Sequence, residues 1–111
     1  MSFKVEITEL ASDFILSLDP KMQAKIQRTI SLLEEFGYNL QEPHSKKIKG
    51  TENLYELRIK VASNICRLFY FFWKNKTYIV TSGYIKKRDK TDSDEIKRAI
   101  NIMNQIRRDN G

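Results

Sequence analysis

The sequence predicts an α+β fold, in which a small, mostly antiparallel sheet of about four strands carries an N-terminal pair of helices and a C-terminal helix. Three observations predict it. Apolar residues recur every three or four positions near both ends of the chain, as they do along amphipathic helices. Between these regions, three β-type segments follow one another with very short connections. The length of 111 residues suits one small core, so we expect a single domain over 1–111.

The N-terminal third predicts one strand and two helices. Residues 3–7 alternate apolar and polar side chains, the period of a half-buried strand. A helix is expected over about 9–18, because four apolar residues share one stripe there: Leu10, Phe14, Ile15 and Leu18. Asp19 then offers an N-cap, Pro20 suits a first helical turn, and Gly37 is a C-terminal stop for the second helix. The two helices would form an antiparallel hairpin.

The middle of the chain predicts a polar loop over 38–53 and then a meander of three strands. The segment 54–61 has one apolar and one polar face. The segment 65–73 is apolar on both faces except for Arg67, as expected of a central strand, and 77–85 follows a tight turn. Connections this short require antiparallel pairing, and we expect the helices to cover one face of the sheet and to leave the other open.

The last predicted element is a helix over about 92–108. Asp92 and Glu95 have the spacing of a capping box. The buried stripe would consist of Ile96, Ala99, Ile100, Met103 and Ile106. Carboxylates complement the dipole at a helix N-terminus without any ion, so we expect no metal and no other cofactor.

Composition argues against several classes of protein. One cysteine and one histidine are too few for a disulfide framework or a structural zinc site, and we expect Cys66 to be a buried thiol in a reducing compartment. The N-terminus lacks the apolar stretch of a signal peptide, and no apolar run approaches membrane-spanning length. We therefore expect a cytoplasmic protein without a membrane partner.

Charge is distributed unevenly along the chain. Residues 1–42 contain 4 basic and 7 acidic residues, whereas residues 43–111 contain 16 basic and 7 acidic ones. Basic residues can simply keep a domain soluble, but this clustering favours a surface that binds a polyanion such as nucleic acid.

Cations occur on all three strands of the predicted meander. Arg58 and Lys60 share a polar face, Arg67 interrupts the central strand, and Lys86 with Lys87 ends the last strand. Antiparallel pairing would bring them together, and like charges so close require a compensating anion. Two interpretations follow: Arg67 is a structural arginine that pairs with Glu56, or the guanidinium groups bind a phosphate.

The order of these segments resembles a known family. LYELRI at 54–59, CRLFY at 66–70 and GYIKK at 83–87, followed by Thr91 and an acidic helix start, are similar to the RelE/ParE toxin superfamily, above all its HigB, phage Gp49-like branch. The resemblance covers nearly the whole chain. Members are toxins of bacterial toxin–antitoxin pairs, and the RelE and HigB branches cut messenger RNA in the ribosomal A site without a metal.

The resemblance implies roles and partners. Arg58 and Arg67 match residues that bind the scissile phosphate, and Lys86 and Lys87 match a basic pair that contacts the transition state or the RNA backbone. Lys46, Lys47 and Lys49 match a basic loop that grips RNA. From their own positions, on the polar strand face and beside Lys86, we also expect Lys60 and Tyr84 to contact RNA. The implied partners are a HigA-like helix-turn-helix antitoxin, the ribosome with its mRNA, and operator DNA reached only through the antitoxin.

The proton-transfer groups are not assigned by the resemblance. Attack of a 2′-hydroxyl on its neighbouring phosphate needs in-line positioning, cations, and a general acid and base. Here Glu56 replaces a lysine found in some RelE proteins, and the C-terminal helix lacks the tyrosine that some carry. The candidates are Glu56, Tyr84, Asp92 and His44. Imidazoles titrate near neutrality, which suits proton transfer, but a lone loop histidine is usually a bystander, and Asp92 is also explained as a helix cap.

Three functions are compatible with the sequence. The leading hypothesis is a ribosome-dependent, metal-independent mRNA endoribonuclease toxin that inhibits translation. The others are a ParE-like toxin that poisons DNA gyrase and a non-catalytic basic RNA-binding module. The cations of the strands, Arg58, Arg67, Lys86 and Lys87, favour the ribonuclease over the gyrase poison.

Overall fold

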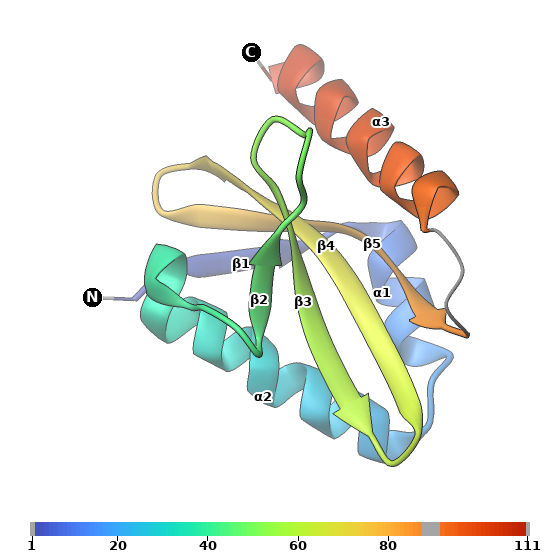
Figure 1. Cartoon of the computed structure of the whole chain (residues 1–111). Helices are drawn as coiled ribbons and strands as arrows, with labels where there is room; N and C mark the ends of the chain where they lie inside the picture. The colour runs from blue at the N-terminus through green and yellow to red at the C-terminus, as the bar shows by residue number, and fades with distance from the viewer. Residues whose placement is uncertain (1, 88–91, 111) are drawn as a thin grey trace.

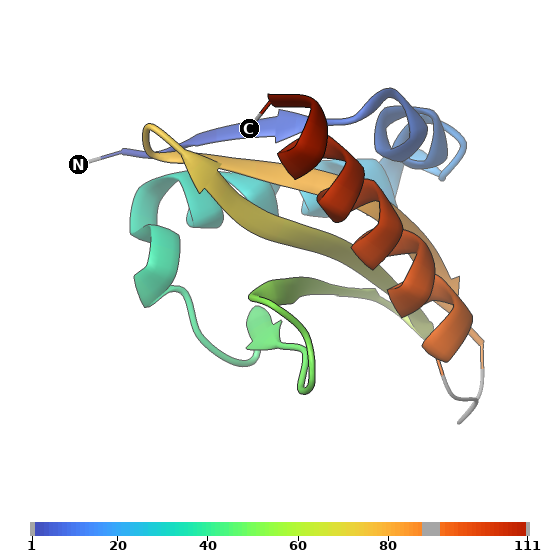
Figure 2. The same cartoon turned by 90° about the horizontal axis from the view of Figure 1, so that it is seen from above.

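A five-stranded sheet between helices forms the fold in the computed structural model, which describes residues 2–87 and 92–110 (Figures 1 and 2). The elements are, in order, β1 (Lys4–Ile7), α1 (Glu9–Leu16), α2 (Pro20–Phe36), the 3₁₀ helix η1 (Gly37–Asn39), β2 (Ser45–Lys47), β3 (Leu54–Val61), β4 (Asn64–Lys74), β5 (Thr77–Lys86) and α3 (Ser93–Asn110). None of the described helices is long and apolar enough to cross a membrane. Thr91, part of the family resemblance, lies outside the described residues.

The predicted antiparallel meander is confirmed. The sheet has the order β1-β5-β4-β3-β2, and β3, β4 and β5 pair antiparallel through tight turns. Ala62, Asn75 and Lys76 adopt positive φ in these turns. The strand predicted at the N-terminus pairs with β5 in parallel and forms one edge of the sheet, a position that its own alternation could not indicate.

The prediction of a loop over 38–53 is wrong in part, because this segment contains the end of η1 and the edge strand β2. Strand β2 pairs antiparallel with β3, with Ser45 opposite Leu57 and Lys47 opposite Tyr55. Ser45 is buried and its hydroxyl hydrogen-bonds with that of Tyr70. A strand of three residues whose one buried side chain is polar shows no alternation of apolar and polar residues. It therefore cannot be predicted from the sequence pattern.

Helices α1 and α2 cover one face of the sheet (Figure 1), where their apolar stripes pack on β5 and β3. The Asp19 carboxylate accepts a hydrogen bond from the Met22 N–H at 2.9 Å, as expected of an N-cap. The stop at Gly37 is also confirmed, since this residue has a φ of 55°. A Cβ at Gly37 would stand 2.2 Å from the Phe3 ring, so no larger residue fits.

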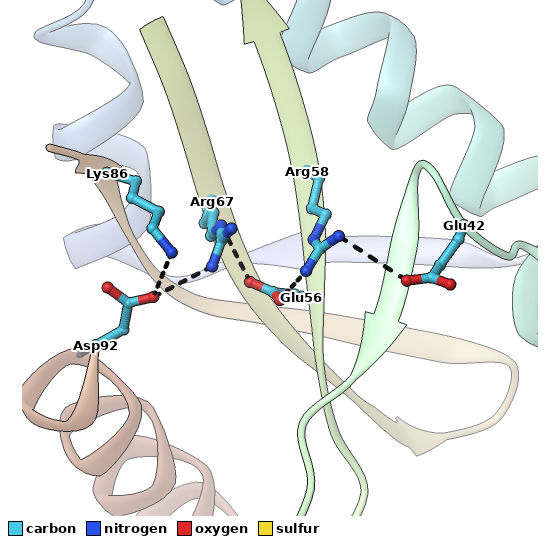
Figure 3. A network of polar contacts seen from close by, with 6 residues as sticks. All are labelled: Glu42, Glu56, Arg58, Arg67, Lys86 and Asp92. Carbon is cyan, nitrogen blue, oxygen red and sulfur yellow. Dashed lines mark hydrogen bonds and ion pairs between the residues drawn. The ribbon is translucent and has the colours of Figure 1, made fainter. Parts of the chain in front are cut away.

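Helix α3 packs across β5 and β4 on the opposite face, which corrects the expectation that this whole face is open (Figure 2). Its Ala99 and Met103 pack in a second core on apolar residues of the sheet: Leu54, Phe69, Phe71 and Ile79. The double-sided apolar pattern of β4 requires such a cover. Polar residues of the meander lie on this face near the N-terminal end of α3 (Figure 3).

Candidate functional site

The strand register brings three cations together on the face that also carries α3. Arg58 of β3 lies directly opposite Arg67 of β4, and Arg67 lies opposite Tyr84 of β5, two residues before Lys86. Arg58, Arg67 and Lys86 are referred to below as the cationic cluster. Two arginines paired across strands repel each other, so the cluster is stable only with carboxylates beside it.

Glu56 is the central carboxylate of the site (Figure 3). One of its oxygens lies 3.4 Å from Arg58 Nη2, and the other lies 3.5 Å from Arg67 Nε. Only 4% of Glu56 is exposed, and both of its oxygens face guanidinium groups. Its contact with Arg67 is the pairing expected of a structural arginine, and the same contact fixes the two guanidinium groups side by side.

Asp92 and Glu42 flank the cluster at its two ends (Figure 3). Asp92 Oδ2 lies 3.1 Å from Arg67 Nη1 and 3.5 Å from Lys86 Nζ. The Asp92 carboxylate, expected to cap α3, thus points towards the sheet, and the capping-box partner Glu95 pairs with Arg98 at 3.2 Å. At the other end, Glu42 Oε1 lies 3.9 Å from Arg58 Nη1. Positive and negative groups therefore alternate across the strands β3, β4 and β5.

Not every donor of the site has a well-formed hydrogen bond. Among the described residues, the buried side-chain atoms without one all belong to this site: Arg58 Nε, Arg67 Nε, which has only the 3.5 Å ion-pair contact with Glu56, and Tyr84 Oη, which lies beside the Asp92 carboxylate. The guanidinium groups therefore have hydrogen-bonding capacity left for an oxyanion. The side chains of Arg58, Arg67 and Lys86 are 32%, 15% and 23% exposed, so an anion can reach them.

Tyr84 is set to act as a donor. Its ring stacks on Phe69 with centroids 5.8 Å apart, so one ring face is already occupied. Burial, and then the neighbouring Asp92 carboxylate, raise the pKa of Tyr84 well above its ordinary value. The hydroxyl therefore keeps its proton throughout the physiological range and can donate it in a hydrogen bond.

The other predicted site residues lie at varying distances from the cluster. The His44 carbonyl accepts a hydrogen bond from the Arg58 N–H at 2.9 Å, which places His44 opposite Arg58 on the β2 side. Lys46 lies opposite Glu56, and Lys87 is exposed one residue beyond β5. Lys60 is not part of the cluster, since it lines a separate hollow beside α2 with Lys21, Lys25 and Arg28.

Cys66 is buried in the core between the sheet and the first two helices, as predicted. Burial raises the pKa of its thiol to about 12. A thiol that stays protonated and has no access to solvent cannot serve as a nucleophile, so the cysteine is structural.

Sequence analysis did not find Glu42 as a member of the site. It lies in the polar segment before β2, where no period or motif distinguishes one carboxylate from another. Its contact with Arg58 is seen only in the structure, where the segment before β2 runs close to β3.

The fold is that of the RelE toxins. A mutant of the Escherichia coli toxin RelE in the free state superimposes with a TM-score of 0.65 at 20% identity, over 91% of this chain and 97% of that chain. The intact E. coli RelBE toxin–antitoxin complex gives a TM-score of 0.59 at 18% identity, over 78% and 100%. An archaeal RelE–RelB complex from Pyrococcus horikoshii gives 0.55 at 20% identity, over 82% and 100%.

The chain belongs to the family described as Phage derived protein Gp49-like (DUF891), whose model matches residues 13–104. Together with the RelE-like fold, this match confirms the family resemblance inferred from the sequence. No curated protein is similar enough in sequence to count as a relative.

Proposed function

We propose that this protein is the toxin of a toxin–antitoxin pair and that it cuts mRNA on the ribosome without a metal, thereby inhibiting translation. The observation that carries the proposal is the cationic cluster, three cations that the strand register brings together within reach of solvent, with Tyr84 beside them. Two guanidinium forks, an ammonium group and a tyrosine hydroxyl on one surface are the groups that bind a phosphodiester and stabilise charge developing on it.

The proposed reaction is attack by the 2′-hydroxyl on the adjacent phosphorus. A bond forms between the 2′-oxygen and phosphorus while the bond to the 5′-oxygen breaks, leaving a 2′,3′-cyclic phosphate and a 5′-hydroxyl. The 2′-hydroxyl proton passes to a base, and an acid protonates the leaving oxygen. Arg58 and Arg67 would hold the non-bridging oxygens, and Lys86 would neutralise the charge that grows on them.

Of the candidates for proton transfer, we assign His44 and Asp92, because they lie at the two ends of the cationic cluster. In an in-line displacement the entering and leaving oxygens lie on opposite sides of phosphorus, so acid and base must flank it. The backbone of His44 pairs with that of Arg58 at one end, and the Asp92 carboxylate contacts Arg67 and Lys86 at the other. Glu56 engages both arginines with its two oxygens and is assigned a positioning role.

His44→Gln and Asp92→Asn should each slow cleavage about a hundredfold or more, because each removes one proton-transfer group. RNA affinity should persist, since the cationic cluster is intact. The measurement is single-turnover cleavage across a pH series, with Asp94→Asn, an exposed carboxylate of α3, as the control. If the Asp92→Asn variant cleaves RNA at the wild-type rate, Asp92 serves only as a counter-ion of the cationic cluster.

The proposed partners follow from the same assignment. Two of the similar RelE structures are complexes with antitoxins. We propose that a cognate HigA-like helix-turn-helix antitoxin binds this chain, that operator DNA is bound only through this antitoxin, and that ribosome and mRNA are met in the cytoplasm.

Induction of this chain alone in a bacterial host should arrest growth by stopping translation, with transcripts cut at ribosome-occupied positions. Labelled amino-acid incorporation, RNA end mapping and an SOS reporter measure these effects, and co-expression of the antitoxin should reverse them. If DNA breaks and an SOS response appear while mRNA stays intact, the proposal is wrong and the protein is a gyrase poison. Retained RNA binding without any cut transcripts or growth arrest would indicate a non-catalytic RNA-binding module.

A further inference from the structure

The short strand β2 forms one edge of the described sheet (Figure 1). The backbones of His44 and Ile48 hydrogen-bond to β3, so the backbone groups of the residues between them alternate in direction. The carbonyl of Ser45 and both backbone groups of Lys47 consequently point away from β3. An edge that presents donors and acceptors in this way is the feature to which an extended peptide adds as a new strand.

A basic groove follows this edge. It has a volume of about 780 Å³ and lies between the segment 38–42 and the segment 46–51. Three lysines line it, Lys46, Lys47 and Lys49, and none of them forms an ion pair with any other residue that the structure describes. A second copy of this chain, with its net charge of +6, would place lysine against lysine at this edge. A strand that carries carboxylates would instead pair with the lysines.

An aromatic hollow adjoins the groove. Its volume is about 470 Å³, within the range of pockets that hold small ligands. Tyr38 and Tyr55 line both spaces, and further aromatic residues of the hollow are Tyr70, Phe72 and Tyr78. Tyr38 is 79% exposed and Phe72 is 45% exposed, so two of these rings are open to contact with a partner. Exposed aromatic rings around a pocket are typical anchor points of protein interfaces.

The hollow lies on the face of the sheet opposite to the cationic cluster. Lys47 pairs with Tyr55, whose ring packs on the core beneath α1 and α2, whereas Arg58 projects from the other face. The Glu42 carboxylate stands at the boundary, since it lines the groove and lies 3.9 Å from Arg58 Nη1. A chain of phosphates leading from the cluster would have to pass this carboxylate and change faces.

The carbonyl groups of the edge also favour a peptide over a nucleic acid. Carbonyl and phosphate oxygens both accept hydrogen bonds, so a phosphate backbone would leave the outward carbonyls of Ser45 and Lys47 without donors. A peptide strand brings N–H groups at the spacing of these carbonyls.

We propose that β2 binds an extended, acidic segment of a partner protein, which adds to the sheet as a further strand. Its carboxylates would pair with Lys47 and Lys49, and an aromatic or large apolar side chain would enter the hollow. Residues two positions apart in a strand share a face, so the carboxylates would flank the inserted side chain at that spacing. The inference goes beyond the proposed function and holds whether or not the chain cuts RNA, because the hollow and the cationic cluster lie on opposite faces.

A labelled synthetic peptide tests the inference by fluorescence anisotropy. It has about nine residues that alternate glutamate and valine, with a central tryptophan in place of one glutamate, so that the tryptophan and the carboxylates share one face. The wild-type chain should bind it saturably below about 1 mM. The same peptide with glutamine in place of glutamate should bind about tenfold more weakly or less.

Methylation of the peptide backbone distinguishes strand addition from simple attraction between charges. Methyl groups on the amides of every second residue block one edge of the peptide, and methyl groups on the remaining amides block the other edge. One of the two methylated peptides should lose binding, and the other should keep it. Equal affinity of the two methylated peptides would contradict strand addition.

Two variants of the chain locate the contact. Lys47→Glu with Lys49→Glu should weaken peptide binding about tenfold or more, because two attractive pairs become repulsive. Tyr38→Ala should weaken it about tenfold through the loss of one wall of the hollow. Lys46 is left unchanged because it lies opposite Glu56.

The controls change equivalent side chains elsewhere. Lys4→Glu with Lys97→Glu alters the net charge equally, at two exposed lysines on the opposite edge of the sheet and on α3. Phe36→Ala removes an exposed aromatic ring that lines neither the groove nor the hollow. At physiological salt, where distant charges are screened, these variants should bind the peptide within about twofold of the wild type.

Absence of saturable binding of the acidic peptide would overturn the inference, and so would unchanged affinity in both groove variants. If single-stranded RNA displaces the peptide and loses affinity for the groove variants, the edge binds RNA and the inference is wrong. A dimer of the wild-type chain that Lys47→Glu with Lys49→Glu abolishes would assign the edge to a second copy instead. Cleavage on the ribosome is measured separately, because an inactive wild-type chain contradicts the proposed function and leaves the peptide results unchanged.

Discussion

Replacing Arg67 with alanine should reduce mRNA cleavage by a factor on the order of a hundred or more, the usual loss when a donor to the transition state is removed. Arg67 has the best-placed cation of the site, since it contacts both Glu56 and Asp92 and lies opposite Arg58. Single-turnover cleavage of ribosome-bound mRNA measures the effect. Arg67→Lys should recover part of the rate, because an ammonium keeps the charge but loses the fork.

The Arg67→Ala variant should remain folded, which keeps the experiment interpretable. Without Arg67, Glu56 still contacts Arg58 and Asp92 still contacts Lys86, so no carboxylate is left without a cation. Arg98→Ala is the matched control, because Arg98 also pairs with a carboxylate near the start of α3 but lies outside the cluster. A folded Arg67→Ala variant with the wild-type rate would make Arg67 a structural arginine only.

Replacing Glu56 with alanine should destabilise the protein by about 2–4 kcal/mol, somewhat less than the loss of one partner of a fully buried pair. Glu56 is buried between Arg58 and Arg67, and without it two guanidinium groups face each other across the strands. The effect is limited because Arg58 is 32% exposed and can turn towards water. Urea unfolding should show a lower midpoint at an unchanged m-value.

The charge origin of this effect can be tested with salt. Added salt should recover part of the stability of Glu56→Ala, because it screens the repulsion between the partly exposed arginines. Glu52→Ala is the matched control: Glu52 is 90% exposed and lies 4.0 Å from Arg107, so its loss should cost less than about 1 kcal/mol. Equal unfolding midpoints for the two variants would show that Glu56 does not hold the arginine pair.

The sequence was sufficient to predict the elements whose side chains repeat. The meander followed from the alternation in β3 and the tight turns, and α2 followed from its stripe, the cap at Asp19 and the stop at Gly37. The proximity of Arg58 and Arg67 could be predicted as well, because a short hairpin constrains the register.

Other features depend on contacts between segments far apart in the chain. Strand β2 is too short to show a period, and the place of β1 beside β5 is decided by packing. The cover by α3 could have been anticipated from β4, whose two apolar faces both need burial. Asp92 contacts Arg67, and Glu42 contacts Arg58, because of the path that two connecting segments take. Local secondary-structure propensities do not encode that path.

The two interpretations of Arg67 are therefore compatible. The pairing of its Nε atom with Glu56 is a structural contact. The outer end of the same guanidinium group points towards Asp92, and the side chain is still partly exposed to solvent. A paired arginine on a sheet can thus be held in position for a phosphate, with the carboxylate serving to orient it.

The most direct measurement is the chemistry of RNA ends produced by the purified chain on ribosomes programmed with a defined mRNA, in the presence of a metal chelator after ribosome assembly. We predict cuts within the mRNA that leave 2′,3′-cyclic phosphate and 5′-hydroxyl ends, formed by the wild type and not by Arg67→Ala. Intact mRNA with the folded wild-type chain, or equal cleavage by the Arg67→Ala variant, would contradict it.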